Sequence, residues 1–137
     1  MSHITKIKSK INNLMMLKSI LSELNYKYIE NSAENPIKIK SWDKKVIDED
    51  FILEIKTGSS YSVGVVLNKK DNTFGFIADW WGIESFTGEK QSDFIDKITQ
   101  KYAYNNILDK IKDKGYQLVS ENVDEDKNIK LVLRKWQ

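Results

Sequence analysis

The order of apolar and polar positions predicts two helices. Residues 11–24 carry four leucines at the spacing of one helical face, and Asn12 or Asn13 can cap the N-terminus of this helix. Residues 92–115 also show helical spacing, and Gly115 is placed to end the helix. The sequence therefore predicts one helix near the start of the chain and a longer helix in its last third.

The longer helix carries two apolar stripes rather than one. At 100° per residue, the second stripe is rotated well away from the first; the first comprises Phe94, Ile95, Ile98 and Tyr102, and the second Tyr104, Ile107, Leu108 and Ile111. No proline or glycine interrupts this part of the chain, so a kink is not expected. The pattern favours a straight helix that is covered from two sides.

Short segments with alternating polarity predict strands between and after the helices. Five of them lie between the helices, at residues 26–31, 36–42, 50–57, 61–68 and 73–81, and a closing hairpin follows at residues 116–123 and 129–136. Strands bounded by helices are typical of the α+β class. We expect a single domain, residues 1–137, with a largely antiparallel sheet of about five to seven strands and two main helices packed on one face.

Two adjacent tryptophans end the segment "TFGFIADWW". If this segment is a strand, alternation places Trp80 with the more apolar side chains in the core, and Trp81 on the face that also carries Asp79. We therefore expect Trp81 to be partly exposed. Exposed tryptophans are enriched among binding hot spots, so Trp81 is a candidate contact for a partner.

Composition restricts the classes of function. With 40% hydrophobic and 31% charged residues in 137, the chain is expected to be folded and soluble, and a net charge of +2 is too small to indicate nucleic-acid binding by itself. The absence of cysteine excludes disulfides, thiolate nucleophiles and cysteine-bound metals. No apolar run approaches the roughly 20 residues of a membrane span, and no secretory signal is recognisable.

Amino-acid composition and motifs together indicate the kind of genome that encodes the protein. Lysine, isoleucine and asparagine are abundant, whereas Arg134 is the only arginine, a bias expected from an AT-rich genome. The segments "MSHITKIKSKI", "ADWWG" and "TQKYAY", with the final "LRKW", resemble the family of the hypothetical chloroplast reading frame thirty-five. The resemblance implies a plastid-encoded protein that works in the chloroplast, and it implies no activity.

Candidate chemistry is sparse. His3 is the only histidine, and without a nearby nucleophile it is a poor signal for a catalytic triad; a contact with a partner is the alternative. The acidic runs at residues 48–50 and 124–126 lack the spaced ligands and glycine of a calcium loop. Phosphate loops, dinucleotide fingerprints and nucleophile elbows are absent from the sequence. We expect no cofactor, no metal and no catalytic residue.

The middle of the long helix is the second candidate surface. Gln100, Tyr102 and Tyr104 place polar and aromatic groups there, and tyrosine is common at interfaces. The alternative is that both tyrosines end the core stripes and only their hydroxyls reach water.

The leading hypothesis is a non-enzymatic binding or assembly module of the plastid stroma that holds a protein partner through Trp81 and the long helix. The alternative is a small enzyme or cofactor-handling protein whose polar site, containing Asp79 and Gln100, lies between sheet and helix. RNA binding is a third hypothesis, since lysines alternate with a tryptophan in residues 36–42, but only in this one segment. The sequence does not identify the partner or the oligomeric state.

Overall fold

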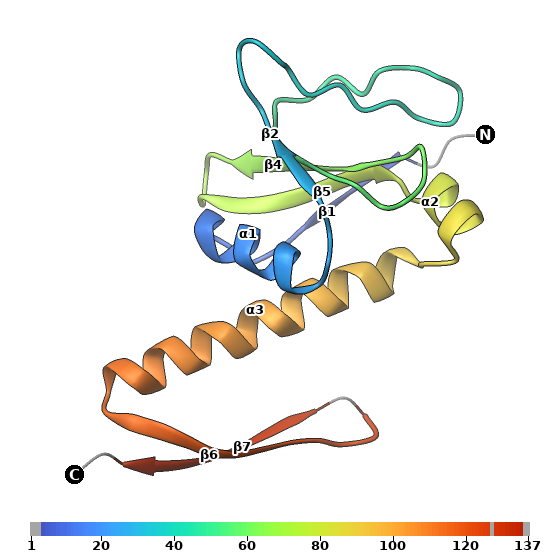
Figure 1. Cartoon of the computed structure of the whole chain (residues 1–137). Helices are drawn as coiled ribbons and strands as arrows, with labels where there is room; N and C mark the ends of the chain where they lie inside the picture. The colour runs from blue at the N-terminus through green and yellow to red at the C-terminus, as the bar shows by residue number, and fades with distance from the viewer. Residues whose placement is uncertain (1–3, 127, 136–137) are drawn as a thin grey trace. The chain divides into compact units, whose positions relative to one another are not determined.

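The computed structural model describes residues 4–126 and 128–135, and these form an α+β fold with three helices and seven strands (Figure 1). In chain order the elements are β1 (Ile4–Lys8), α1 (Leu14–Glu23), β2 (Tyr28–Glu30), β3 (Phe51–Ile55), β4 (Val63–Asn68), β5 (Thr73–Asp79), α2 (Trp80–Thr87), α3 (Gln91–Asp113), β6 (Tyr116–Val123) and β7 (Ile129–Lys135).

Contacts divide the chain into two compact units. Unit 1 is Met1–Gln100 and unit 2 is Lys101–Gln137, so α3 begins in the first unit and ends in the second. Unit 1 contains an antiparallel five-stranded sheet with the strand order β1-β5-β4-β3-β2, and unit 2 contains the hairpin β6–β7. The candidate surfaces of each unit are therefore built from that unit's own residues.

One of the five strands of the sheet differs from the sequence prediction. Residues 36–42 do not form a strand; they make only an isolated bridge between Lys40 and Val46, and β1 takes the edge of the sheet beside β5 instead. The alternation of Ile37 and Ile39 has another cause, because both side chains pack onto the outer face of the sheet. An alternating pattern indicates a half-buried extended segment, whether or not the segment joins a ladder.

Helices cover one face of the sheet. In α1, Leu17, Ile20 and Leu21 are buried, and Asn13 caps the helix, its side chain accepting a hydrogen bond from the backbone N–H of Met16. The first part of α3 buries Phe94, whose ring lies 6.5 Å from that of Phe76 in β5 and 5.6 Å from that of Trp80, measured between centroids. This face is the main core of unit 1.

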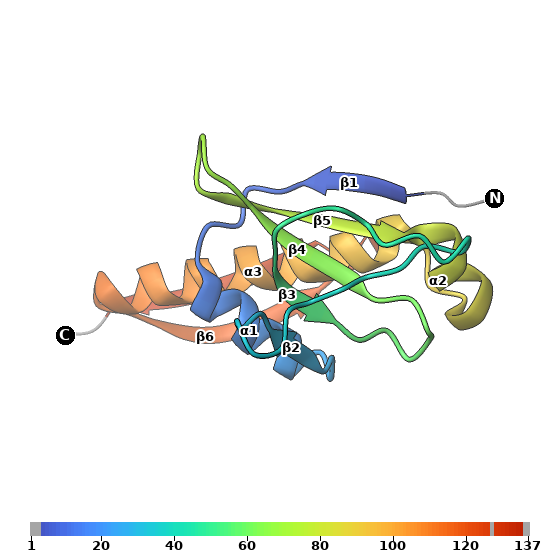
Figure 2. The same ribbon diagram turned by 90° about the horizontal axis from the view of Figure 1, so that it is seen from above.

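The opposite face of the sheet is also buried, which corrects the expectation of an exposed face. Residues 36–47 cross it on the side away from α1 (Figures 1 and 2), and Ile39 joins Phe51, Val66 and Ile77 in a buried cluster. Gly64 allows this close packing, since a Cβ there would lie 2.2 Å from the Phe51 ring. Both faces of β5 are therefore inaccessible to a partner.

The two tryptophans do not belong to β5, so the prediction that strand alternation separates them is wrong. The strand ends at Asp79, and α2 begins at Trp80. The Asp79 side chain accepts a hydrogen bond from the backbone N–H of Gly82 and so caps the helix. Gly88, in the left-handed conformation with φ of 76°, ends it.

Unit 2 agrees closely with the sequence prediction. The hairpin β6–β7 occupies the expected segments, and Gly115, with φ of +80°, follows the end of α3. The helix is unbroken. Phe94 and Ile98 of its first stripe are buried in unit 1, whereas in the second stripe Ile107 is 47% exposed, and Leu108 and Ile111 line a cleft that β6 also borders. The expected cover is therefore found for the first stripe only.

Candidate functional site

Four aromatic side chains meet at the surface of unit 1, and we call them the aromatic cluster: Trp42, Tyr61, Trp81 and Phe86. The Trp42 ring stacks near Tyr61 with centroids 6.3 Å apart, and Tyr61 stacks near Phe86 at 5.9 Å. Trp81 meets Trp42 edge to face at 4.9 Å. Such offset and edge-to-face geometries are favourable for aromatic pairs, so the four rings form one continuous surface.

Asp79 connects the parts of the chain that carry these rings. It is fully buried, and its Oδ2 accepts a hydrogen bond of 2.6 Å from the backbone N–H of Trp42, 37 residues away. Its Oδ1 accepts from the backbone N–H of Gly82 at 3.2 Å. One carboxylate therefore holds the turn that carries Trp42 against the helix that carries Trp81.

The Trp42 turn is also held by local bonds. The backbone N–H of Ser41 donates to the carbonyl of Lys45, and that of Lys44 donates to the carbonyl of Ser41. The Ser41 hydroxyl donates to the carboxylate of Asp43, and this bond lowers the pKa of Asp43. The turn is therefore a defined structure that presents Trp42 in one orientation.

Tyr61 is positioned by a glycine and by a small hydroxyl network. A Cβ at Gly82 would lie 2.8 Å from the Tyr61 ring, so only glycine lets the ring lie directly on α2. The hydroxyls of Thr57 and Ser59 both donate to the carbonyl of Tyr61, at 2.5 and 3.1 Å. These contacts place Tyr61 between Trp42 and Phe86.

The aromatic cluster is open to solvent over three of its four rings. Trp42 is 41% exposed, Trp81 is 40% exposed and Phe86 is 64% exposed. Single exposed apolar residues are common on proteins, but a contiguous group of large aromatic side chains is typical of a contact surface. Trp81 is thus exposed because it lies on the outer side of α2, and not because of strand alternation.

The other residues singled out in the sequence lie elsewhere. Gln100 is exposed at the end of unit 1, whereas Tyr102 and Tyr104 are half-buried in unit 2. The Tyr104 hydroxyl donates to the carboxylate of Glu121, and this hydrogen bond raises the pKa of Tyr104. His3 lies outside the described residues. Trp81 and the helix tyrosines consequently belong to different compact units.

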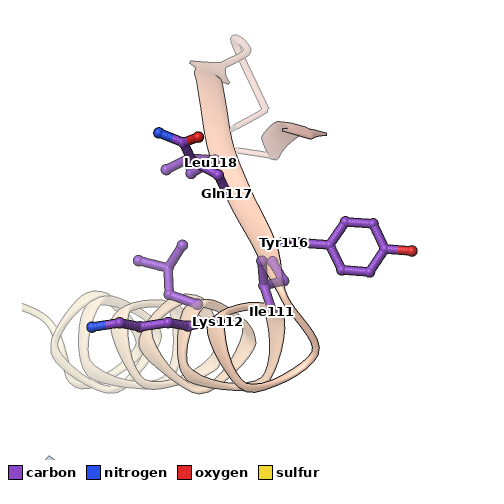
Figure 3. Close-up of a pocket in the computed structure, with 6 residues that line it drawn as sticks. Ile111, Lys112, Tyr116, Gln117 and Leu118 are labelled. Atoms are coloured by element: carbon purple, nitrogen blue, oxygen red, sulfur yellow. The ribbon is translucent and has the colours of Figure 1, made fainter. Parts of the chain in front are cut away.

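Unit 2 contains a cleft between the end of α3 and β6 (Figure 3). Its volume is about 310 Å³, and its lining is almost wholly apolar; it is formed by Leu108, Ile111, Lys112, Tyr116, Gln117 and Leu118. The cleft offers no cluster of titratable groups, so it has the character of a packing groove rather than of a reaction site.

A polar cluster lies between the end of α1 and α3. The Tyr26 hydroxyl donates to Glu89 at 2.6 Å, and Lys97 donates to both Tyr26 at 2.6 Å and Glu89 at 2.9 Å. Burial, followed by the bond to Glu89, raises the pKa of Tyr26. Burial opposes the charge on Lys97, but its bonds to Tyr26 and Glu89 outweigh this effect and raise the pKa of Lys97.

The raised pKa values of Tyr26 and Lys97 indicate that this polar cluster has a structural role. A general base needs a pKa close to the working pH, and in both side chains the pKa moves further from neutrality. Tyr26 and Lys97 therefore stay protonated at neutral pH. The cluster ties the segment after α1 to the start of α3, and Lys97 also lies 4.7 Å above the Tyr26 ring.

Residues 4–126 and 128–135 also bear on metal sites and membrane spans. Within these ranges, acidic and histidine side chains do not gather in groups of three or more that could hold a metal ion. No helix in the same ranges has the length and apolar character required to cross a membrane.

Sequence reasoning missed two members of the aromatic cluster. Tyr61 stands at the start of an apolar run and Phe86 in a segment expected to be a turn, so neither carries a local signal. The available signal was the run "DWWGIESFTG", in which Asp79 is a helix N-cap and Gly88 is placed to end the helix. A helix there would have put Trp81 and Phe86 on the same short element.

Comparison with known proteins identifies relatives over nearly the whole chain. It is 32% identical over 143 residues to an uncharacterized protein ycf35 of Guillardia theta, and 31% identical over 142 residues to one of Pyropia yezoensis. The ycf35 protein of Cyanophora paradoxa is 32% identical over 138 residues, and each alignment covers 99% of this chain and 98% of the relative. Ycf35 is the name of a reading frame of plastid genomes, which implies a plastid origin.

No solved structure matches this chain at a significant level. A family model described as "Protein of unknown function (DUF1257)" matches residues 20–132, which includes the whole aromatic cluster. Together with the relatives, this match establishes that the chain belongs to the DUF1257 family of proteins of unknown function.

Proposed function

We propose that the protein is a non-enzymatic binding module of the plastid stroma that holds a protein partner through the aromatic cluster. The observation that carries this proposal is that Trp42, Trp81 and Phe86 are all at least 40% exposed, while Trp81 contacts Trp42 directly and Tyr61 links Trp42 to Phe86. Large aromatic side chains at the centre of a contact surface supply most of the energy of many interfaces. The helix residues Gln100, Tyr102 and Tyr104 remain candidates for a second contact.

The cluster is organised before any partner binds. Asp79, the Ser41–Lys45 turn and the packing of Tyr61 on Gly82 restrain the rings in the free protein. Binding then loses little side-chain entropy, which is one of the main costs of association. Residues with a purely structural role would not need to be both restrained and exposed.

The polar groups nearest to an enzymatic alternative have structural partners. Asp79, which that alternative places in a polar site, is fully buried and bonded to two backbone N–H groups. The raised pKa values of Tyr26 and Lys97 keep both groups protonated at neutral pH. These observations support binding rather than acid–base chemistry.

The experiment compares three tagged forms of the protein expressed in plastids. The double variant Trp81→Ala/Phe86→Ala removes two exposed rings, and Met15→Ala removes a side chain that is 82% exposed on α1 and serves as the control. Proteins that co-purify are identified, and the affinity of each purified candidate is measured by calorimetry.

We expect the double variant to bind at least about tenfold more weakly than the unchanged protein, and Met15→Ala to bind equally well. Circular dichroism confirms that both variants are folded. A folded double variant that keeps the full affinity for the partner would place the binding surface elsewhere.

A further inference from the structure

A polar hollow lies beside the aromatic cluster. Its volume is about 140 Å³, and it is lined by Lys38, Ile39, Lys40, Glu54, Ser60 and Ser62. Ser60 and Ser62 flank Tyr61 in the chain, and Lys40 comes two residues before Trp42. The two segments 38–42 and 60–62 thus contribute to both the polar hollow and the aromatic cluster.

The hollow is electropositive. Its single carboxylate, Glu54, accepts a hydrogen bond from Ser62 at 2.7 Å and forms an ion pair with Lys56 at 2.9 Å. Within the described part of the chain, Lys38 and Lys40 form no ion pair. Their positive charges are therefore not neutralised inside the protein.

The turn that carries Trp42 adds two more lysines, Lys44 and Lys45, but acidic residues offset them. Asp43 lies within the turn, and Asp48, Glu49 and Asp50 follow it, so that residues 38–50 have a net charge of zero. Asp43 lies 4.0 Å from Lys45 and accepts a hydrogen bond from Ser41. The surface therefore combines exposed aromatic rings with two lysines, Lys38 and Lys40, that form no ion pair within the described residues.

Lysines and serine hydroxyls bind either carboxylate or phosphate, so the aromatic rings decide between a protein and a nucleic acid. Single-stranded nucleic acids bind by stacking a base on an open aromatic face. In the aromatic cluster the rings use their faces on one another: Trp42, Tyr61 and Phe86 stack in sequence at 6.3 and 5.9 Å, and the Trp81 ring meets Trp42 edge to face. The rings form a closed apolar surface, which suits aliphatic or aromatic side chains.

We propose that the partner presents an acidic segment, with an apolar side chain against the aromatic cluster and an adjacent aspartate or glutamate in the polar hollow near Lys38 and Lys40. This inference rests on the proposed function and adds the chemistry of the partner to it. The lysines increase the rate of encounter with such a segment, and the rings hold it once it is bound.

The test uses a random library of 12-residue peptides displayed on phage, selected on the full-length protein. We expect enriched peptides to carry aspartate or glutamate next to leucine, isoleucine or an aromatic residue. Synthetic copies of these peptides are then titrated against Lys38→Gln/Lys40→Gln and against the control Lys69→Gln/Lys70→Gln. The control removes the same charge from the exposed turn between β4 and β5.

Removal of the hollow lysines should weaken binding by about fivefold to tenfold in dilute salt, and the control should bind as the unchanged protein does. The loss should shrink as the salt concentration rises, because screening weakens both lysine contacts. Equal affinity for the two lysine variants, or enriched peptides without acidic residues, would overturn the inference. A library that yields no enriched peptide would also overturn it.

Failure of the proposed function has a different signature. Peptides that bind Trp81→Ala/Phe86→Ala as tightly as the unchanged protein would refute the role of the aromatic cluster, whatever the lysines do. A random library of 12-nucleotide RNAs, selected on the protein in parallel, tests whether the surface binds RNA instead of an acidic protein segment. Sequences from it that bind more tightly than any peptide, and lose binding with Lys38→Gln/Lys40→Gln, would identify the surface as an RNA site and reject the acidic segment.

Discussion

The substitution Asp79→Asn tests whether one buried carboxylate holds the aromatic cluster together. In the native protein, Oδ2 accepts from the backbone N–H of Trp42 at 2.6 Å and Oδ1 accepts from that of Gly82 at 3.2 Å. Asparagine has the same shape, but it has one acceptor oxygen, and an NH₂ group replaces the other. Only one of the two N–H groups can therefore keep its partner.

The expected loss follows from this geometry. Asparagine is as good an N-cap as aspartate, so the bond to Gly82 can be retained. The N–H of Trp42 then faces an NH₂ group, and the loss of a short bond to a charged acceptor costs about 1.5–3 kcal/mol. With about 3 °C per kcal/mol for a chain of this size, the melting midpoint should fall by roughly 4–10 °C.

Urea titration followed by far-ultraviolet circular dichroism measures the free energy of unfolding. The indole N–H resonance of Trp42, assigned with a Trp42→Phe variant, reports on the turn directly. We expect that resonance to shift or broaden in Asp79→Asn, since the turn loses its attachment to α2. Glu84→Gln is the matched control, because it makes the same chemical change on an exposed side chain of α2 and should alter the free energy of unfolding by less than about 0.5 kcal/mol.

An Asp79→Asn variant with the stability of Glu84→Gln and an unchanged Trp42 resonance would refute this reasoning. The turn would then be held by its own backbone bonds and by the packing of Ile39 on the sheet. A large loss of stability with an unchanged resonance would instead assign Asp79 to the helix cap alone.

Four further substitutions test other parts of the fold. Trp80→Ala should lower the free energy of unfolding by about 3–5 kcal/mol, because Trp80 is only 5% exposed, whereas Trp81→Ala should cost less than about 1 kcal/mol; equal losses in urea titrations would contradict the assignment of the two rings. Gly115→Val should cost about 1–2 kcal/mol from backbone strain alone, since φ is +80° and a Cβ would meet no atom within 4 Å. An unchanged melting midpoint would show that the helix does not need this residue. Tyr26→Phe should destabilise the protein at pH 7, and its deficit relative to the unchanged protein should shrink above about pH 10. The raised pKa values of Tyr26 and Lys97 mean that the folded state holds these protons more tightly than the unfolded state, so their contribution is complete below pH 10 and is lost as the pH rises. A deficit that is constant from pH 7 to pH 11 would argue against the shifts.

The sequence alone was sufficient where the deciding interactions are local. A cap at Asn12 or Asn13, of which the structure uses Asn13, the bounds of the β6–β7 hairpin and the left-handed Gly115 follow from residues within a few positions of each feature. The two stripes of α3 were also visible as periodicity, although the sequence did not show that only the first of them is buried. Caps, turns and helical spacing act over one or two turns of chain, and such signals can be read from the order of residues.

Tertiary structure decided what the sheet buries. The strand-like alternation of residues 36–42 is real, but Ile37 and Ile39 use it to cover the outer face of the sheet, and β1 takes the edge position instead. Pairing depends on which segment can reach the edge of the sheet, and not on alternation within a segment. The sequence pattern is the same in both cases.

The aromatic cluster is the clearest case of a feature decided by the tertiary structure. The sequence marked Trp81 as a candidate for contact, but its ring meets Trp42, which comes from a turn 37 residues before Asp79, and Trp42 in turn stacks near Tyr61. A buried carboxylate can be satisfied by any backbone N–H that the fold delivers to it. Which N–H arrives depends on the path of the whole chain. The sequence therefore indicated one candidate contact residue, and only the folded structure assembled the surface around it.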